Sequence, residues 1–419
     1  MKEFWPKYYD EEDEELRLNN FHLSQNRNRI EICDSVNRTL NEDAPTKEYY
    51  ERKNELRTTN HWGQRKLLLS EIEFLTEYGH KSSLVVYAGA APGVKNEYLT
   101  YLFPEHEFIF IDPMPFRDNL IAASKENDRI TLKEEFFTDK IAMEYCEKNV
   151  LFICDIRTAD IKIMGLEEVE DAIVEDNKMQ LSWHLIMKPA ASMLKFRLPW
   201  GKGTTRYLSG YSEEGKIYFP VWGRQSTTET RLVAVGDDVY DYDNTKYAEQ
   251  LFYFNTITRC NYYKHDIYGV PGLCHCYDCS SEVLILTNYA KKFPQYWFIN
   301  DDEDSNTNPS TEDINNWVRN TCLQLNEECA ASGNRDLTIQ IGNTQNWFPP
   351  KVFDQKNGIV TEFDVKLDPT IDLYGGREAR GYEDNKDILG KRSTMYNIDS
   401  PPKKKLKDQN GEEQEATEE

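Results

Sequence analysis

The stretch SLVVYAGAAPGVKNEYLTYLF, residues 83–103, contains a short apolar strand, a glycine-bearing turn and the start of a helix. This order is typical of an α/β unit that binds a nucleotide-like cofactor. The dinucleotide fingerprint, the phosphate loop and the loop for S-adenosylmethionine all begin in this way. Because the turn at residues 89–93 has neither the G-x-G-x-x-G spacing nor a G-K-[ST] ending, the first two are less favoured.

Apolar runs and amphipathic segments alternate around this stretch. Strands are expected at 84–88, 107–112, 130–132, 150–155, 191–198 and 231–235, and helices at 63–79, 95–103, 138–148 and 167–187. Strands that form continuous apolar runs are typical of a parallel sheet buried on both faces. We therefore predict a doubly wound, mostly parallel α/β domain over residues 63–291, with ligands beyond the carboxyl ends of its strands.

The remainder of the chain gives weaker signals. Residues 1–62 are predicted to form a polar, irregular arm with a short helix at 49–56. Further helices are expected at 246–258 and 280–293. Residues 292–374 form an appended segment to which the sequence assigns no role, and residues 375–419 have too few large apolar residues to fold by themselves.

Composition limits the class of protein. The net charge of −23 argues against a protein that coats nucleic acid through its overall field. With no membrane-length apolar run, no signal peptide and nine cysteines without framework spacing, we expect a soluble intracellular protein. Residues 188–206 contain five cations and no acid, and are the first place to look for contacts with phosphates.

Two side features leave alternatives open. Cys274, Cys276 and Cys279 are too tightly spaced for a standard zinc site, so free thiols are favoured over a metal. Lys391, Arg392 and the basic run 403–407 resemble a bipartite nuclear localisation signal. Such a run is as often a solvated tail or a nonspecific RNA-binding tail.

Charged residues stand at several strand ends. Asp112 follows the second strand, where an acid can accept hydrogen bonds from ribose hydroxyls. Asp155 follows the fourth strand and is either a turn cap or a site residue. Lys195 lies within the apolar strand ASMLKFRLPW, where it either extends its ammonium to water or is buried, which would lower its pKa and make it a base. Glu229 begins the sixth strand, whereas Lys66, in the first amphipathic helix, taken alone suggests a surface residue.

Seven segments stand in a characteristic order along the chain: GQRKLLLSEIEFL, VVYAGAAPG, FIFIDPMPF, LFICDIRT, WHLIMKP, ASMLKFRLPW and TTETRLVAV. Together they resemble the poxvirus-type cap-specific mRNA 2′-O-methyltransferases of the FtsJ-like RNA 2′-O-methyltransferase group. The resemblance covers about residues 66–279. It is specific because Lys66, Asp155, Lys195 and Glu229 match the family's Lys-Asp-Lys-Glu tetrad in order and local context.

The resemblance implies methyl transfer from S-adenosylmethionine to the ribose 2′ hydroxyl of the first transcribed nucleotide of capped mRNA, with Lys195 as the base. The implied cofactor residues are Gly89, Ala90, Ala91, Pro92, Gly93, Asp112, Asp155 and Ile156. The implied cap residues are Trp200 and Tyr49 or Tyr50, whose rings would clamp the charged 7-methylguanine. The acid-free stretch 188–206, and not the resemblance, supplies the expected RNA contacts Arg197, Lys202 and Arg206. Glu135 and Lys202 depart from the family, which has a basic residue and an acid there.

Two rival functions belong to other classes. The chain is alternatively an RNA-binding subunit or processivity factor of a viral poly(A) polymerase, with or without methyltransferase activity. A nicotinamide-dependent oxidoreductase is disfavoured by the missing fingerprint and by Lys66 and Lys195. The expected partners are capped mRNA and a poly(A) polymerase catalytic subunit or other transcription machinery, with no membrane. The expected location is the cytoplasm, a virion or, if the tail signal acts, the nucleus.

Overall fold

The computed structural model describes residues 32–49, 63–159, 163–223, 227–268, 270, 273, 275–298, 308–331, 352–354 and 359–361. All of them belong to one of the two compact units into which the chain divides. Tyr50, Cys274, most of the predicted helix 49–56, the predicted disordered tail and its basic clusters lie outside these residues. Within the described ranges, no helix is long and apolar enough to cross a membrane.

A seven-stranded sheet in the order β4-β3-β2-β5-β6-β9-β8 forms the centre of the fold. Its strands are β2 (Leu84–Ala88), β3 (Glu107–Ile111), β4 (Ile130–Lys133), β5 (Leu151–Cys154), β6 (Ala191–Phe196), β8 (Lys216–Tyr218) and β9 (Thr230–Ala234). The first five strands of that order pair in parallel, whereas β9 is antiparallel to both β6 and β8. The predicted doubly wound, mostly parallel sheet is confirmed.

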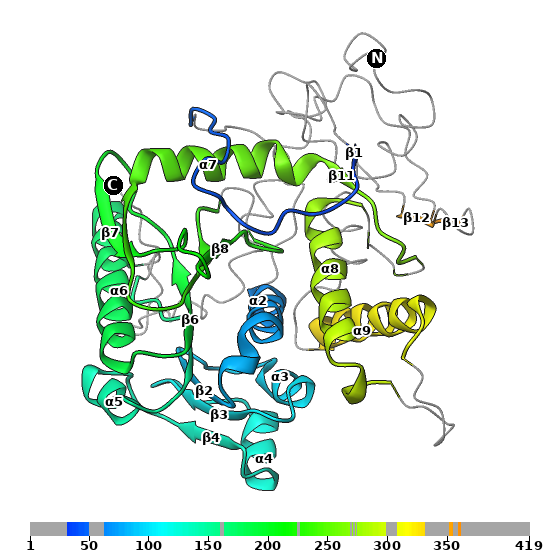
Figure 1. Ribbon diagram of the computed structural model, residues 1–419, viewed down its shortest axis with the longest axis horizontal. Coiled ribbons are helices and arrows are strands. Elements are labelled where there is room, and N and C mark those ends of the chain that lie inside the picture. Colours follow the sequence, from blue (N-terminus) through cyan, green and yellow to red (C-terminus); the bar gives the residue numbers. More distant parts are fainter. Residues whose placement is uncertain are drawn as a thin grey trace, which may run out of the picture. The chain divides into compact units, whose positions relative to one another are not determined.

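Helices cover both faces of the sheet (Figure 1). One core contains side chains of α2 (Gly63–Tyr78), α3 (Asn96–Leu102), α4 (Asp118–Glu126), α8 (Tyr277–Lys292) and α9 (Thr311–Ala331). The other contains side chains of α5 (Asp139–Glu144), α6 (Leu166–Met187) and α7 (Asn244–Thr256). Along β2, Val85 and Tyr87 face the first core, and Val86 and Ala88 face the second. This alternation explains why the strand is apolar throughout.

The remaining elements are short. They are β1 (Ile32–Cys33) parallel to β11 (Tyr262–Tyr263), β7 (Thr204–Leu208) antiparallel to β10 (Val239–Asp243), β12 (Val352–Asp354) antiparallel to β13 (Ile359–Thr361), and the 3₁₀ turns η3 (Gly79–Lys81), η4 (Thr258–Cys260) and η5 (Pro294–Tyr296). Residues 32–49 run irregularly and are held at β8, where Leu40 N donates to Ile217 O. Arg38 adds two hydrogen bonds to Glu73 of α2, at 3.0 and 2.8 Å.

All six predicted strands exist, with ends that differ from the predicted ones by at most two residues. The helices expected at 63–79, 167–187, 246–258 and 280–293 are confirmed, and those at 95–103 and 138–148 are shorter, at 96–102 and 139–144. Helices α4 and α9 and strands β7, β8 and β10 were not predicted. In α9, Ile314, Val318, Cys322 and Leu325 are buried at helical spacing within an otherwise polar segment. That spacing is the sequence signal by which the helix could have been found.

Helix α2 buries charged groups against two neighbours. Arg65, 1% exposed, makes a double hydrogen bond with Glu282 of α8 at 2.9 and 2.5 Å. Glu282 Oε2 also accepts from Trp222 Nε1 at 2.7 Å. Further along α2, Glu71 Oε1 accepts from the Tyr87 hydroxyl of β2 at 2.7 Å. Because these groups are out of water, each depends on its partner.

We expect Glu282→Gln to destabilise the protein by about 3–5 kcal/mol, because it leaves the Arg65 guanidinium buried without its counter-charge. Urea unfolding of the two proteins measures the difference. Glu175→Gln is the matched control, since its ion pair with Lys178 is exposed on both sides and is worth roughly 0–1 kcal/mol. Equal unfolding midpoints for the two variants would contradict this account of the α2–α8 contact.

Glu71 makes stability depend on pH. Burial raises its pKa from 4.5 to about 7 against the opposing hydrogen bond from Tyr87. Because its pKa is raised in the folded state, the folded protein prefers protonated Glu71. The stability associated with the protonated carboxyl is fully present below pH 4.5 and is lost as pH rises to about 7. We therefore compare the free energy of unfolding of Glu71→Gln with that of the native protein. We expect the difference between them to grow in favour of the variant by up to about 3 kcal/mol between pH 4.5 and pH 8. Urea unfolding at both pH values tests this, with Glu175→Gln expected to show no such gain.

Candidate functional site

The four predicted tetrad residues meet at one edge of the sheet. Asp155 follows β5 directly, and Lys195 lies near the end of β6. Glu229 precedes β9, and because β9 runs antiparallel to β6, with Thr230 opposite Phe196, its first residues reach the same edge. Lys66 comes from the first turn of α2. The side chains of all four are between 12% and 14% exposed, so they are shielded but open to a ligand.

These residues form one connected network. Lys195 Nζ lies 3.0 Å from Asp155 Oδ1 and donates to Asp155 O at 2.9 Å. Lys66 Nζ lies 2.6 Å from Glu229 Oε1. Arg231 joins the two pairs, because its guanidinium is 2.7 Å from Asp155 Oδ1 and 3.0 Å from Glu229 Oε1.

Arg231 is a site residue that the sequence analysis missed. It stands two residues after Glu229 in β9, and side chains two apart in a strand point to the same side. The two-residue spacing from Glu229 was the sequence signal by which Arg231 could have been found. Arg157, which pairs with Glu229 Oε2, was missed as well.

Positive charge is in excess in this network. Lys66, Lys195, Arg157 and Arg231 face two carboxylates. Burial lowers the pKa of Lys66, although Glu229 opposes the shift. Burial would raise the pKa of Glu229, but Lys66 and Arg231 hold it well below its usual value. The Glu229 carboxylate therefore stays ionised, and loss of a proton by Lys66 relieves repulsion among the cations.

The predicted cofactor residues lie beside this network. Gly89 and Gly93 have φ values of +80° and +70°, which favour glycine, and a Cβ on Gly89 would lie 2.8 Å from Ile156 N. Asp112 fixes the loop, because its Oδ2 accepts from Ala91 N at 3.1 Å and its Oδ1 accepts from Met114 N at 2.8 Å. The loop 89–93, Asp112 and Ile156 thus follow three neighbouring strands, β2, β3 and β5.

This arrangement fits a nucleoside cofactor such as S-adenosylmethionine. Each carboxylate oxygen of Asp112 keeps a lone pair that can accept from a ribose hydroxyl. The residue that departs from the family, Glu135, follows β4, where its side chain is 50% exposed and lies 3.9 Å from Lys133 Nζ. An acid there is compatible with an adenine amino group, which is a hydrogen-bond donor.

Two of the predicted cap-binding aromatics lie together. The rings of Tyr49 and Trp200 are 5.2 Å apart between centroids and tilted by 51°, and the two residues are 47% and 43% exposed. Phe252 of α7 supports Tyr49 edge-on at 5.3 Å. Trp200 N donates to Glu170 Oε2 of α6 at 2.8 Å, which fixes the backbone below the indole. Tyr50 lies outside the described residues.

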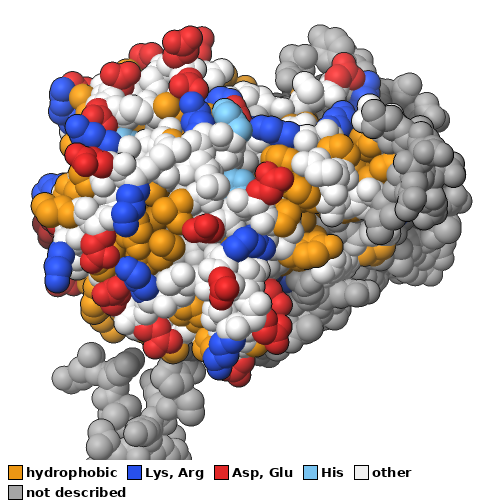
Figure 2. Space-filling model, turned by 60° about the horizontal axis from the view of Figure 1, so that its bottom comes forward, with side chains coloured by type: hydrophobic (Ala, Val, Ile, Leu, Met, Phe, Trp, Pro, Cys, Tyr) orange, Lys and Arg blue, Asp and Glu red, His pale blue; other side chains and the backbone are white. Residues whose placement is uncertain are grey.

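The predicted RNA-contacting cations differ in their availability. Arg197 is 16% exposed and pairs with Glu170 at 2.5 Å, and Arg206 is 67% exposed but pairs with Asp241 at 3.1 Å. Lys202 is exposed. On the face seen in Figure 2, basic and acidic side chains are interspersed, with hydrophobic groups between them. No continuous basic surface covers that face.

Of the predicted cysteine group, Cys276 and Cys279 are buried at the start of α8, and Cys276 Sγ accepts from Cys279 N at 3.5 Å. Cys276 thereby caps the helix. In the part of the chain that the structure describes, no three His, Cys, Asp or Glu side chains are placed to hold a metal ion together.

Several known proteins are similar to this chain in sequence. Two curated viral relatives carry the name cap-specific mRNA (nucleoside-2′-O-)-methyltransferase. The protein of myxoma virus (strain Lausanne) is 25% identical over 215 residues, which is 48% of this chain and 62% of the relative. That of fowlpox virus (strain NVSL) is 25% identical over 217 residues, 47% of this chain and 68% of the relative. This chain therefore matches less than two thirds of the length of the myxoma protein.

Among solved structures, the chain is similar to two methyltransferases. One is a 1,6-didemethyltoxoflavin-N1-methyltransferase of Burkholderia thailandensis with bound S-adenosylhomocysteine, 12% identical, with a TM-score of 0.21 over 40% of this chain and 62% of that one. The other is an antibiotic-related methyltransferase, 14% identical, with a TM-score of 0.22 over 46% of this chain and 100% of that one.

A family profile matches a much longer part of the chain. It is described as poly A polymerase regulatory subunit and covers residues 38–320, from within the N-terminal segment 32–49 to the middle of α9. This range includes the whole sheet and all four tetrad residues. The chain therefore belongs to the poly(A) polymerase regulatory subunit family.

Proposed function

We propose that the chain transfers a methyl group from S-adenosylmethionine to the ribose 2′ hydroxyl of the first transcribed nucleotide of capped mRNA. The observation that carries this proposal is the network of Lys66, Glu229, Arg231, Asp155 and Lys195 beside the loop 89–93. It brings Lys195 and the loop 89–93 to one part of the carboxyl edge of the sheet, where such folds bind their ligands.

When bound, S-adenosylmethionine supplies a methyl group that its sulfonium has already activated. Asp112 would accept from its ribose, and the loop 89–93 with Asp155 and Ile156 would border the rest. The protein then has to align the 2′ hydroxyl for an in-line displacement and to take one proton from it.

The hydrogen bonds of Lys195 suit a proton acceptor. A neutral amine has two N–H bonds and one lone pair, and Asp155 offers two acceptors, its main-chain O and Oδ1, at 2.9 and 3.0 Å from Nζ. The main-chain O accepts a hydrogen bond from Nζ, and Oδ1 lies at ion-pair distance on the carboxylate. A neutral Lys195 held by these two oxygens would direct its lone pair to the hydroxyl proton. Arg231 shares Asp155 Oδ1 and so fixes the carboxylate that orients Lys195.

Tyr49 and Trp200 would hold the 7-methylguanine of the cap. Two stacking contacts of about 3.5 Å each require rings roughly 7 Å apart and parallel. The observed 5.2 Å and 51° describe rings in mutual contact, so cap binding requires them to separate. Their exposure leaves room for this movement, and a positively charged base between two rings is favoured by cation–π attraction.

Membership of the family supports a second role at the same time. The family description supports binding to a poly(A) polymerase catalytic subunit, and we propose this subunit as a protein partner alongside capped mRNA. The tetrad network neither requires nor excludes such a partner. The basic clusters at 391–392 and 403–407 would direct the complex to a nucleus if they act as a localisation signal.

Lys195→Ala is expected to lower methyl transfer to capped RNA by at least about 100-fold, because the hydroxyl loses its proton acceptor. Binding of S-adenosylhomocysteine should change less than twofold. The assay measures labelled methyl on short RNAs with a 7-methylguanosine cap or a 5′ triphosphate, followed by digestion to locate the label. Lys195→Arg should be equally inactive, since arginine does not lose its proton. Lys178→Ala, an exposed lysine on α6, is the control, and full activity in either Lys195 variant would exclude Lys195 as the base.

Trp200→Ala is expected to raise KM for capped RNA about tenfold or more and to leave kcat and cofactor binding nearly unchanged, because it removes one stacking ring. Trp200→Phe should keep most of the affinity. Met143→Ala, at an exposed position on α5, serves as the control. The same KM for capped RNA in Trp200→Ala and the native protein would show that the cap binds elsewhere.

A further inference from the structure

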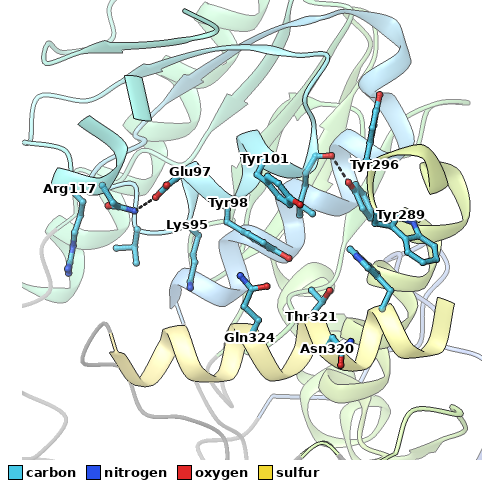
Figure 3. Close-up of a pocket in the computed structure, with 15 residues that line it drawn as sticks. Lys95, Glu97, Tyr98, Tyr101, Arg117, Tyr289, Tyr296, Asn320, Thr321 and Gln324 are labelled. Atoms are coloured by element: carbon cyan, nitrogen blue, oxygen red, sulfur yellow. Dashed lines mark hydrogen bonds between the residues drawn. The ribbon is translucent and has the colours of Figure 1, made fainter. Parts of the chain in front are cut away.

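A cavity of about 790 Å³ lies between α3 and α9, and the start of α4 and the end of α8 with η5 complete its walls (Figure 3). It shares no lining residue with the tetrad network, with the loop 89–93 or with the Tyr49–Trp200 pair. None of the roles proposed above uses it.

The wall formed by α8, η5 and α9 is aromatic and fixed. Tyr289 and Trp317 stack with centroids 5.3 Å apart, and Trp297 contacts Trp317 at 5.6 Å. The Tyr289 hydroxyl donates to Leu102 O, and Trp297 Nε1 donates to Ala290 O at 2.9 Å. These rings are held in place by packing and hydrogen bonds, which makes the wall rigid.

The α3 wall offers rings to a ligand. Tyr98 and Tyr101 lie in stacked orientation, 6.2 Å apart with 21° between their planes. Tyr101 is 69% exposed, which is unusual for so large a side chain at the mouth of an aromatic cavity. Figure 3 shows Lys95 and Tyr98 on the side of the cavity that faces α9, from which Thr321 and Gln324 point back. Apolar rings and hydrogen-bonding groups thus face each other.

The charge of the lining is opposite to that of the chain. The chain has 73 acidic and 50 basic residues, yet the cavity is lined by two cations, Lys95 and Arg117, and one acid, Glu97. Glu97 is engaged, because its Oε2 accepts from Asn119 Nδ2 at 2.7 Å. Arg117 is exposed at one end of the cavity, and the aromatic rings extend from there along α3. A ligand that fits has a negative charge at one end and flat rings beyond it.

We propose that this cavity binds nucleotides, with one or two bases stacked on Tyr101 and Tyr98 and a phosphate at Arg117. Aromatic side chains bind bases by stacking without sequence preference, and nearby cations take the backbone phosphates. The amide of Asn320 offers a donor and an acceptor to base edges. The volume suits a mononucleotide or dinucleotide, whether free or part of an RNA strand. This inference does not rest on the methyl-transfer proposal.

The test uses the full-length chain and measures binding of three uncapped ligands by calorimetry: AMP, the dinucleotide pApA and a six-nucleotide single-stranded RNA. S-adenosylhomocysteine and a 7-methylguanosine cap analogue are present at saturating concentrations, so that neither a cofactor site nor a cap site accounts for the signal. Tyr101→Ala should weaken binding about tenfold or more, and Tyr101→Phe should retain it. Arg117→Ala should lower the slope of log Kd against log salt concentration by about 0.7. Lys125→Ala, an exposed lysine of α4 outside the lining, should leave that slope unchanged.

Each outcome has a defined meaning. Binding of AMP or pApA as tight as that of the hexamer, with the variant effects above, supports a site for free nucleotides. Tight binding of the hexamer alone supports a site for an RNA strand. Absence of binding by all three ligands, or binding that Tyr101→Ala and Arg117→Ala leave unchanged, overturns the proposal. The proposal is also overturned if a proline-rich peptide binds to the native protein in place of the three nucleotide ligands and does not bind to Tyr101→Ala.

Discussion

The reversed direction of β9 is the constraint on which the tetrad network depends. In a fully parallel sheet, the residue before a strand lies at the amino edge, far from the ends of its neighbours. Because β9 is antiparallel to β6, Glu229 and Arg231 reach the edge at which β5 and β6 deliver Asp155 and Lys195. A single change of strand direction thus converts two separate ion pairs into one network. Arg231 is central to it, since its planar guanidinium can hold two carboxylates at once.

Helix α2 shows how the fold keeps charged groups in its interior. Arg65 faces α8, Lys66 faces the sheet edge, and Glu71 faces β2. Burying an ion pair gains little over an apolar contact, but it makes each partner indispensable to the other. The consequence is that α2 is held in a fixed position by Glu282 on one side and by Tyr87 on another. Lys66 therefore projects from a rigid element, and a site built on such elements is more precise than one built on loops.

The sequence was sufficient for the parts of the fold that have strong local periodicity. The apolar strands and helices α2 and α6 are predictable because each carries its pattern within a few residues. The strands β7, β8 and β10 are only three to five residues long and pair with segments distant in sequence, so local patterns do not reveal them. The tetrad was assigned through resemblance, since no rule of spacing links Lys66 to Glu229. Arg157 and Glu71 were missed because their importance comes only from contacts across 72 and 16 residues.

The cavity and the loop 89–93 are neighbours through the backbone. Arg117 N, at one end of the cavity, donates to Pro92 O at 3.0 Å. Asn96, beside Lys95, donates through Nδ2 to Ala90 O at 3.3 Å. The segments that carry the cations of the cavity therefore also supply donors to the loop. A ligand that moves either segment changes the hydrogen bonds of the loop, and a ligand that fixes the loop restricts both segments. Because binding free energies are linked reciprocally, occupancy of the cavity and of the cofactor loop would affect each other by the same factor.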